Sequence, residues 1–450
     1  MQKQELRAVG SLAAVFSVRL LGLFMIYPVF ADYARQLSGA TPFKTGLALG
    51  IYGLSQGLLQ IPFGLLSDRW GRKPMIVLGL LLFGAGSAVA ALSSTIDGVI
   101  VGRVLQGGGA VGAVILALVA DLTGEESRTQ AMAVVGVSIG GAFMFALIAG
   151  PVLAGLIGVP GIFWAMVGLA LVGIAITAFV VPRPLVLAVH RDAETVPSLL
   201  RSIASEPELR RLDFGVFTLH AMLTASFLRV PALLRSSLDI DSHHQWVVYL
   251  PVLLVSVAVM VPAIIVAEKY RRMKTVFVMA VAALAASQCL FLAGSGGFWV
   301  IAGVTLFFAG FNVMEASLPS LVTKTAPPAA KGTAAGIFST SQFLGIFAGG
   351  VGGGWIQQTL GGNAVFLASL ALSVLWLLVA STMKQPSYLT TRLIRIADGR
   401  FFDPVKLTEG LRKVPGVAEA VVVSEERLAY LKVDSRSYDA AMAQSLVAGA

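Results

Sequence analysis

The sequence contains little cysteine and little charge. One of its 450 residues is cysteine, Cys289, and 13% are Asp, Glu, Lys or Arg, about half the charged share of an average soluble domain. One cysteine excludes an intramolecular disulfide and a metal site made of several thiolates. So few charges could not cover the surface of a soluble protein of this length. Catalytic triads, metal triads and phosphate loops are also missing from the sequence, so we expect neither an enzyme nor a metal or organic cofactor.

Long apolar runs dominate the chain instead. Hydrophobic residues make up 56% of it, and runs of about 20 apolar residues recur, which is the length that lets a helix cross a bilayer. The first run is too long for the core of a signal peptide, so we expect no cleaved leader. We predict twelve transmembrane helices, at residues 9–31, 45–66, 75–95, 97–120, 131–155, 160–182, 213–234, 245–267, 275–294, 297–322, 332–357 and 363–383.

The basic residues predict the orientation of these helices. Eighteen Lys and Arg residues lie on the side of the membrane that holds the N-terminus, against three on the other side, Arg35, Lys44 and Arg235. Because positive residues collect in cytoplasmic loops, we expect both ends of the chain in the cytoplasm and the bundle in the inner membrane. The net charge of +9 then reflects this bias, and we expect no nucleic-acid partner.

Four segments can be distinguished along the chain. We predict six-helix bundles at 1–182 and 213–385, joined by a charged linker at 183–212 that carries a short amphipathic helix, and a soluble domain at 388–450. A shift of 200 residues aligns the acidic–basic pair at 68–69 with the pair at 268–269, as two parallel six-helix repeats would. The expected fold is therefore an all-α membrane protein with a small additional domain.

The soluble domain has an α+β pattern. Asp403 followed by Pro404 predicts the start of a helix, with strand-like β-branched runs after it and a second helical pattern at the end. The order β-α-β-β-α indicates a ferredoxin-like domain without its last strand. Residues Leu411–Val417 resemble a pattern of ferredoxin-like metal-binding domains, but the segment has no cysteine, so we expect no copper-type site. A regulatory ligand or protein partner stays open.

The loop between the second and third predicted helices carries a long motif. It contains a glycine, then an acidic–basic pair, then Gly-Arg-Lys, at Gly64, Asp68, Arg69, Gly71, Arg72 and Lys73. This motif resembles the signature loop of the major facilitator superfamily, and the resemblance covers roughly residues 1–385. It implies a twelve-helix secondary transporter that exposes a central site to each side of the membrane in turn.

We expect this loop to hold one conformation shut. Gly64 lacks a Cβ and would let a neighbouring helix approach closely. Asp68 favours the positive end of a helix, which by resemblance is the start of the eleventh span. Arg69 and Arg72 need a carboxylate, for which Asp121 at the end of the fourth span is the best candidate. The alternative is that the basic residues merely set the topology.

Two further motifs lie inside predicted helices. Arg103, followed by Gln-Gly at 106–107, resembles a second motif of the superfamily whose arginine is linked to proton transfer; the alternative is a structural arginine. Gly150, Pro151 and Gly155 resemble the motif that marks antiporters, although Ala154 replaces a glycine of that motif. The alternative for this segment is an ordinary proline kink.

Ionisable residues within the spans are few. Glu315 lies in an apolar stretch of the tenth span, where a carboxyl group favours its protonated form and can carry a proton. His220 in the seventh span lies at the same depth, about 10 Å from the end of its span at 1.5 Å per residue. Equal depth permits a pair, but a lone histidine can equally serve as a hydrogen bond between helices.

The substrate cavity is expected between the two halves near the middle of the membrane. Aromatic, methionine and amide side chains suit the binding of apolar molecules. The candidates, each of which could instead be ordinary packing, are Arg19, Tyr27, Gln56, Gln60, Met144, Phe227, Asn312, Gln342 and Phe343.

These features favour a proton-coupled antiporter that exports small hydrophobic or drug-like molecules, with protons as the coupling ion. The partners would be the bilayer and a small-molecule substrate. Two alternatives stay open: a proton symporter for nutrient uptake, and a membrane sensor whose soluble domain is the output.

Overall fold

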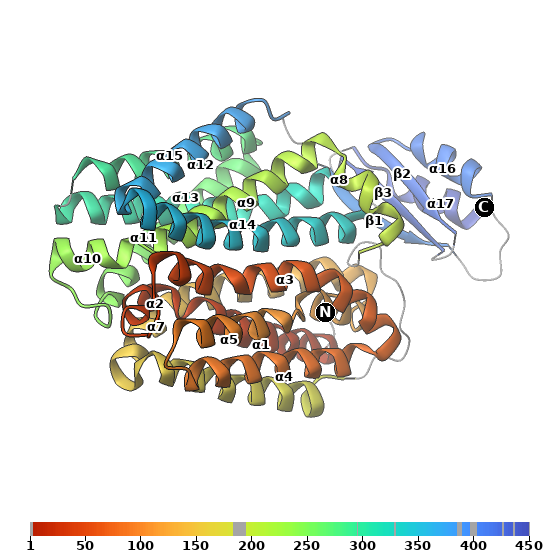
Figure 1. The fold of residues 1–450 in the computed structure, drawn as a ribbon. Helices are drawn as coiled ribbons and strands as arrows, with labels where there is room; N and C mark the ends of the chain where they lie inside the picture. The colour runs from red at the N-terminus through yellow and green to blue at the C-terminus, as the bar shows by residue number, and fades with distance from the viewer. Residues whose placement is uncertain are drawn as a thin grey trace.

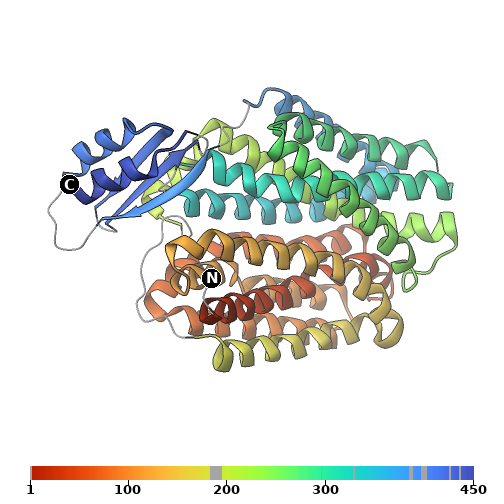
Figure 2. The same ribbon diagram turned by 180° about the vertical axis from the view of Figure 1, so that it is seen from behind.

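The computed structural model describes residues 3–182, 195–294, 296–327, 330–384, 389–396, 403–424, 427–434 and 437–449. These residues form a helical bundle with a small α+β domain at one end (Figure 1). We call that end of the bundle the domain-side end and the other the opposite end. The N-terminal and C-terminal halves of the bundle lie side by side in both views (Figures 1 and 2).

Broken helices are a feature of the N-terminal half. Its first and fourth spans each consist of two shorter helices, and α7 is 51 residues long, about 75 Å and more than twice the thickness of a bilayer core. Gly158, with φ of 69°, bends the chain within α7, so this helix contains two spans. The helices are α1 (Lys3–Phe24), α2 (Tyr27–Ala34), α3 (Pro42–Trp70), α4 (Arg72–Leu92), α5 (Ile96–Gly108), α6 (Gly112–Asp121), α7 (Glu125–Ala175) and η1 (Ile176–Val180).

The C-terminal half repeats this plan. Its helices are α9 (Pro207–Phe227), α10 (Val230–Leu238), α11 (Trp246–Lys269), α12 (Met273–Ala293), α13 (Gly297–Thr325), α14 (Lys331–Leu360) and α15 (Gly362–Ser381). Within the described residues, ten helices are long and apolar enough to cross a membrane, or eleven with the bent pair α9 and α10 taken as one span. Counting α7 as two spans gives the twelve predicted ones, and the predicted membrane fold is confirmed.

The linker is partly helical. Residues 183–194 lie outside the described part of the chain, and η2 (Pro197–Leu199) and α8 (Leu200–Ala204) follow. Ile203 of α8 is buried, as an amphipathic helix requires. The next helix, α9, begins at Pro207 rather than at the predicted residue 213, because proline at the first helical position fixes a suitable φ.

The C-terminal domain has the predicted α+β class. Its elements are β1 (Thr390–Arg395), α16 (Pro404–Arg412), β2 (Val417–Val423), β3 (Leu428–Val433) and α17 (Ala440–Gly449). The antiparallel sheet has the order β1-β3-β2, with both helices packed on its buried residues. Lys432 of β3 donates to the carbonyl oxygen of Thr325, the last residue of α13, at 3.3 Å, so the domain contacts the C-terminal half directly.

Helices α3 and α14 run side by side along the boundary between the halves (Figure 1). Glycines make this contact close. A Cβ on Gly46 of α3 would overlap the carbonyl oxygen of Gly350 of α14, and one on Gly50 would lie 2.9 Å from the carbonyl oxygen of Phe347. Such approach is typical of membrane helices that pack through small residues.

We expect Gly350→Ala to weaken this contact strongly. The added Cβ would meet Gly46 and lie 2.8 Å from the Cα of Gly50, which should cost about 1–3 kcal/mol of overpacking. The matched control is Gly352→Ala on the same helix, where nothing lies within 4 Å of the added atom. Thermal unfolding in detergent should show a lower transition temperature for Gly350→Ala only; equal transition temperatures would contradict the close contact.

Candidate functional site

A buried ion-pair cluster forms at the domain-side end. The Nε of Arg72 lies 3.0 Å from Oδ2 of Asp121, and the two side chains are 2% and 0% exposed. The same guanidinium bonds to Ser67 and to the carboxylate of Asp68. Lys73 donates to the carbonyl oxygen of Val181 at 2.8 Å, just beyond η1. Arg72, preceded by Gly71 with φ of 92°, therefore lies at the centre of the signature loop.

Other parts of this loop differ from expectation. Arg69 is exposed, and no ion pair or hydrogen bond of its side chain is found within the described residues, whereas Arg72 does contact Asp121. A Cβ on Gly64 would meet only Ala113, at an ordinary 3.6 Å, so close helix approach does not require glycine here in this conformation. Gly64 and Asp68 instead line a pocket of about 50 Å³, which Gly332 and Gly336 of α14 line from the other half.

A second polar network surrounds Arg103 in the N-terminal half. This fully buried arginine donates to the carbonyl oxygen of Ala48 at 3.2 Å and to Oε1 of Gln106 at 2.7 Å. Gln106 in turn donates to Ser87 of α4 at 2.7 Å. The guanidinium lies 4.8 Å from the ring centre of Tyr52, a residue that the sequence did not single out.

The structure brings together His220 and Glu315. Nε2 of His220 lies 3.6 Å from Oε2 of Glu315, and the side chains are 1% and 31% exposed. Nδ1 of His220 lies 3.1 Å from the carbonyl oxygen of Val216, which can only accept, so Nδ1 carries a hydrogen. In the neutral ring Nε2 is then an acceptor, and the amide nitrogen of Gln342 lies 2.8 Å from it. A proton can therefore reside on the histidine or on the carboxyl group of one pair.

The other predicted cavity residues have mixed positions. Gln60 lines the pocket beside Gly64 and accepts from Gln56 at 3.3 Å. Met144 is partly buried, and the backbone of Phe343 contacts Gly53 across the two halves. Asn312 instead donates to Ser256 of α11 at 2.6 Å, which places it within the C-terminal half.

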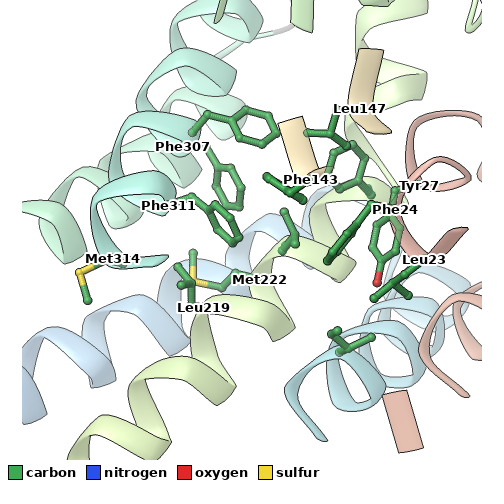
Figure 3. Packing of buried hydrophobic residues seen from close by; sticks show 14 of the residues in the cluster. Leu23, Phe24, Tyr27, Phe143, Leu147, Leu219, Met222, Phe307, Phe311 and Met314 are labelled. Carbon is green, nitrogen blue, oxygen red and sulfur yellow. The ribbon is translucent and has the colours of Figure 1, made fainter. Parts of the chain in front are cut away.

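Aromatic side chains fill the boundary between the halves near the pair (Figure 3). Tyr27 packs edge-on against Phe227, with ring centres 5.5 Å apart, and its hydroxyl lies 3.4 Å from Thr224 of the other half. The ring centres of Phe143 of α7 and Phe311 of α13 are 5.3 Å apart. The sequence predicted Tyr27 and Phe227, but not Phe143 or Phe311, because phenylalanine is common in every apolar span.

Contacts between the halves close the opposite end of the bundle. Asp32 of α2 pairs with Arg235 of α10 and accepts from Ser242, all at the carboxylate oxygen Oδ2. The antiporter-like motif contacts the same region: a Cβ on Gly150 would overlap the carbonyl oxygen of Met25, and one on Gly155 would lie 3.1 Å from His243. Pro151 is buried within α7.

The chain is similar in sequence and in fold to known proteins. The Major Facilitator Superfamily family matches residues 12–350 and 214–415, and the YajR YAM domain family matches residues 394–447. The chain is 44% identical to the inner membrane transport protein YajR of Escherichia coli (strain K12) over 96% of this chain and 95% of that protein.

The chain is also similar to more distantly related transport and resistance proteins. The class E tetracycline resistance protein of Escherichia coli is 33% identical over 34% of this chain and 37% of its own length. The crystal structure of a bacterial homologue of the human lysosomal transporter Spinster, inward-facing and occupied, has a TM-score of 0.71 at 12% identity, over 85% of this chain and 98% of that one, and shows the fold alone. The chain therefore belongs to the major facilitator superfamily, as a homologue of YajR with its C-terminal YAM domain, and is a secondary transporter rather than an enzyme.

Proposed function

We propose that this transporter is a proton-coupled antiporter that exports small hydrophobic or drug-like molecules. The observation that carries the proposal is the pair of His220 and Glu315, two titratable side chains 3.6 Å apart within spanning helices of the C-terminal half. Ionisable groups inside membrane helices are costly and usually serve ion or proton pathways. The names of relatives, an inner membrane transport protein and a tetracycline resistance protein, support transport of a small drug-like molecule.

The proposed cycle uses the two ends of the bundle in turn. The Asp32–Arg235 pair holds the opposite end closed, while a small pocket lined by Asp68 of α3 and Gly332 of α14 lies between the halves at the domain-side end. Substrate enters from the domain side when Glu315 is deprotonated. After the halves rock, Asp68 approaches the positive end of α14, and a proton from the other side displaces the substrate.

The proposed orientation places the domain-side end in the cytoplasm, with both chain ends there, in the inner membrane. The excess of basic residues at this end and the inner-membrane name of the relative support it. The C-terminal domain would then sense a cytoplasmic ligand or partner. Its contact with Thr325, at the end of the helix that carries Glu315, gives it a route to the transport site.

Proton flux in liposomes tests the proposal. Purified protein is reconstituted with a pH-sensitive dye inside, and gradients of lipophilic cations, neutral aromatic drugs and aromatic sulfonates are imposed. We expect at least one class to drive protons in the direction opposite to its own movement. Protons moving with the substrate would indicate a symporter, and no proton movement with any compound would contradict proton coupling.

We expect Asp32→Asn to open the opposite end. The change removes the charge that Arg235 pairs with across the halves, so the conformation open at that end becomes more populated. Spin labels on α2 and α10, in a protein with Cys289 replaced by Ser, should report longer distances in the variant. Asp97→Asn breaks an exposed pair within one half and is the control; unchanged distances in Asp32→Asn would contradict the closing role.

A further inference from the structure

Two arginines of the N-terminal half share one aromatic ring. The guanidinium carbons of Arg19, on α1, and of Arg103, on α5, lie 5.8 Å and 4.8 Å from the ring centre of Tyr52 on α3. All three residues are at most 5% exposed. We call these three residues the arginine subsite.

The positive charge of the arginine subsite has no counter-ion among the described residues. Arg103 donates to neutral oxygens of Ala48 and Gln106, and its Nη2 is buried with no hydrogen-bond partner there. Nε and Nη2 of Arg19 are also buried and lack a partner in the described structure. Each carboxylate of the N-terminal half whose side chain is described has a hydrogen bond or ion pair with a residue other than Arg19 and Arg103. These carboxylates are Glu5, Asp32, Asp68, Asp97 and Asp121.

Buried guanidinium N–H donors that lack an acceptor are costly inside a membrane protein, and a bound anion is the group that would satisfy them. Planar guanidinium groups bind carboxylates and other oxyanions through parallel N–H donors. Neither a helix terminus nor an exposed patch is involved, because the donors come from two different spanning helices.

The residues around the arginine subsite favour an aromatic organic anion as its ligand, and they include a polar path to it from the domain-side end. Tyr27 packs within the aromatic cluster between the halves, and it belongs to the same half of the bundle as Arg19 and Arg103. Gln56 follows Tyr52 by one turn of α3. It donates to Gln60, and its buried Oε1 has no hydrogen-bond partner in the described structure. Gln60 lines the pocket at the domain-side end, so polar groups run from that pocket to the arginine subsite.

We propose that the arginine subsite binds the acidic group of an aromatic organic substrate whose ring packs against Tyr27 and its aromatic neighbours. This inference rests on the proposed export function and narrows its substrate class to amphipathic anions. Arg19 and Arg103 then recognise the substrate in the N-terminal half, while the proton binds in the C-terminal half.

Equilibrium binding of three matched probes tests the inference on the purified full-length protein. The probes are 1-naphthalenesulfonate, its neutral sulfonamide, and (1-naphthylmethyl)trimethylammonium, which share a ring system and do not titrate near neutral pH. We expect the sulfonate to bind at least about tenfold more tightly than the sulfonamide, as charged hydrogen bonds provide. In Arg19→Gln this preference should disappear with sulfonamide affinity unchanged, and Arg19→Lys should restore part of it.

The controls separate this inference from a structural role and from the export proposal. Lys44→Gln removes an exposed positive charge from the same half and should keep the preference. The inference would be overturned by any of three results. The sulfonate fails to bind, all three probes bind with equal affinity, or Arg19→Gln lowers the affinity for all three probes equally. Competition by chloride at equal concentration would overturn the organic substrate class. Because binding needs no proton gradient, charge preference without proton flux would contradict only the export proposal.

Discussion

Replacing Glu315 by Gln should abolish proton-driven transport while leaving the protein folded. The amide keeps the size of the side chain and can still hydrogen-bond to His220, but it cannot take up or release a proton. Substrate moving down its gradient should then produce no proton flux above that of empty liposomes. Exchange of labelled for unlabelled substrate should persist, because exchange needs the rocking of the halves but no net proton movement.

The matched control for this prediction is Glu268→Gln. Glu268 is a carboxylate at the domain-side end of α11 that pairs with Lys324, so its loss removes the same charge outside the spanning region. Proton flux should continue in this variant. If Glu315→Gln loses exchange together with proton flux even at saturating substrate, the residue acts in substrate binding or folding, and its role as the proton site is contradicted.

Asp121→Asn should produce the largest loss of stability among these variants. The change leaves Arg72, whose side chain is 2% exposed, without its most buried counter-charge. Breaking a buried ion pair from one side costs about 3–5 kcal/mol, and the lower end applies here because Arg72 keeps its contacts with Asp68 and Ser67. Thermal unfolding in detergent measures the loss.

A surface ion pair provides the comparison for this prediction. Glu208→Gln breaks the partly exposed pair with Arg211 on α9, and such pairs contribute only about 0–1 kcal/mol. The double variant Arg72→Met/Asp121→Leu should recover part of the stability, because it removes both charges of the buried Arg72–Asp121 pair rather than one. Equal transition temperatures for Asp121→Asn and Glu208→Gln would show that the buried pair is not a stabilising centre.

The sequence predicted those features of the structure that depend on residues close together along the chain. The twelve spans follow from apolar length, and the predicted ends at 155 and 160 flank the bend at Gly158. Asp403 does cap α16, accepting from the backbone N–H of Val405 and Lys406, because capping involves residues a few positions apart. The depth of Glu315 and His220 likewise came from counting residues along their helices.

Features that depend on how helices rotate against one another could not be predicted. Asp32 and Arg235 are about 200 residues apart, and nothing local indicates that they meet. Tyr52 was missed because a tyrosine in an apolar span resembles any packing residue until two arginines are found over its ring. The motif named both Arg69 and Arg72 as partners for Asp121, and only the helix geometry distinguished them.

The dependence of substrate affinity on pH tests the central claim of proton antiport most directly. The substrate is the compound that the flux assay identifies, and its charge must not change over the pH range. If proton and substrate favour opposite conformations, linkage requires wild-type affinity to weaken as pH falls, by at most about tenfold per pH unit for one proton. We predict this weakening in the wild type and constant affinity in Glu315→Gln. Affinity that strengthens with acid in the wild type, or a pH dependence that survives in Glu315→Gln, would contradict the claim.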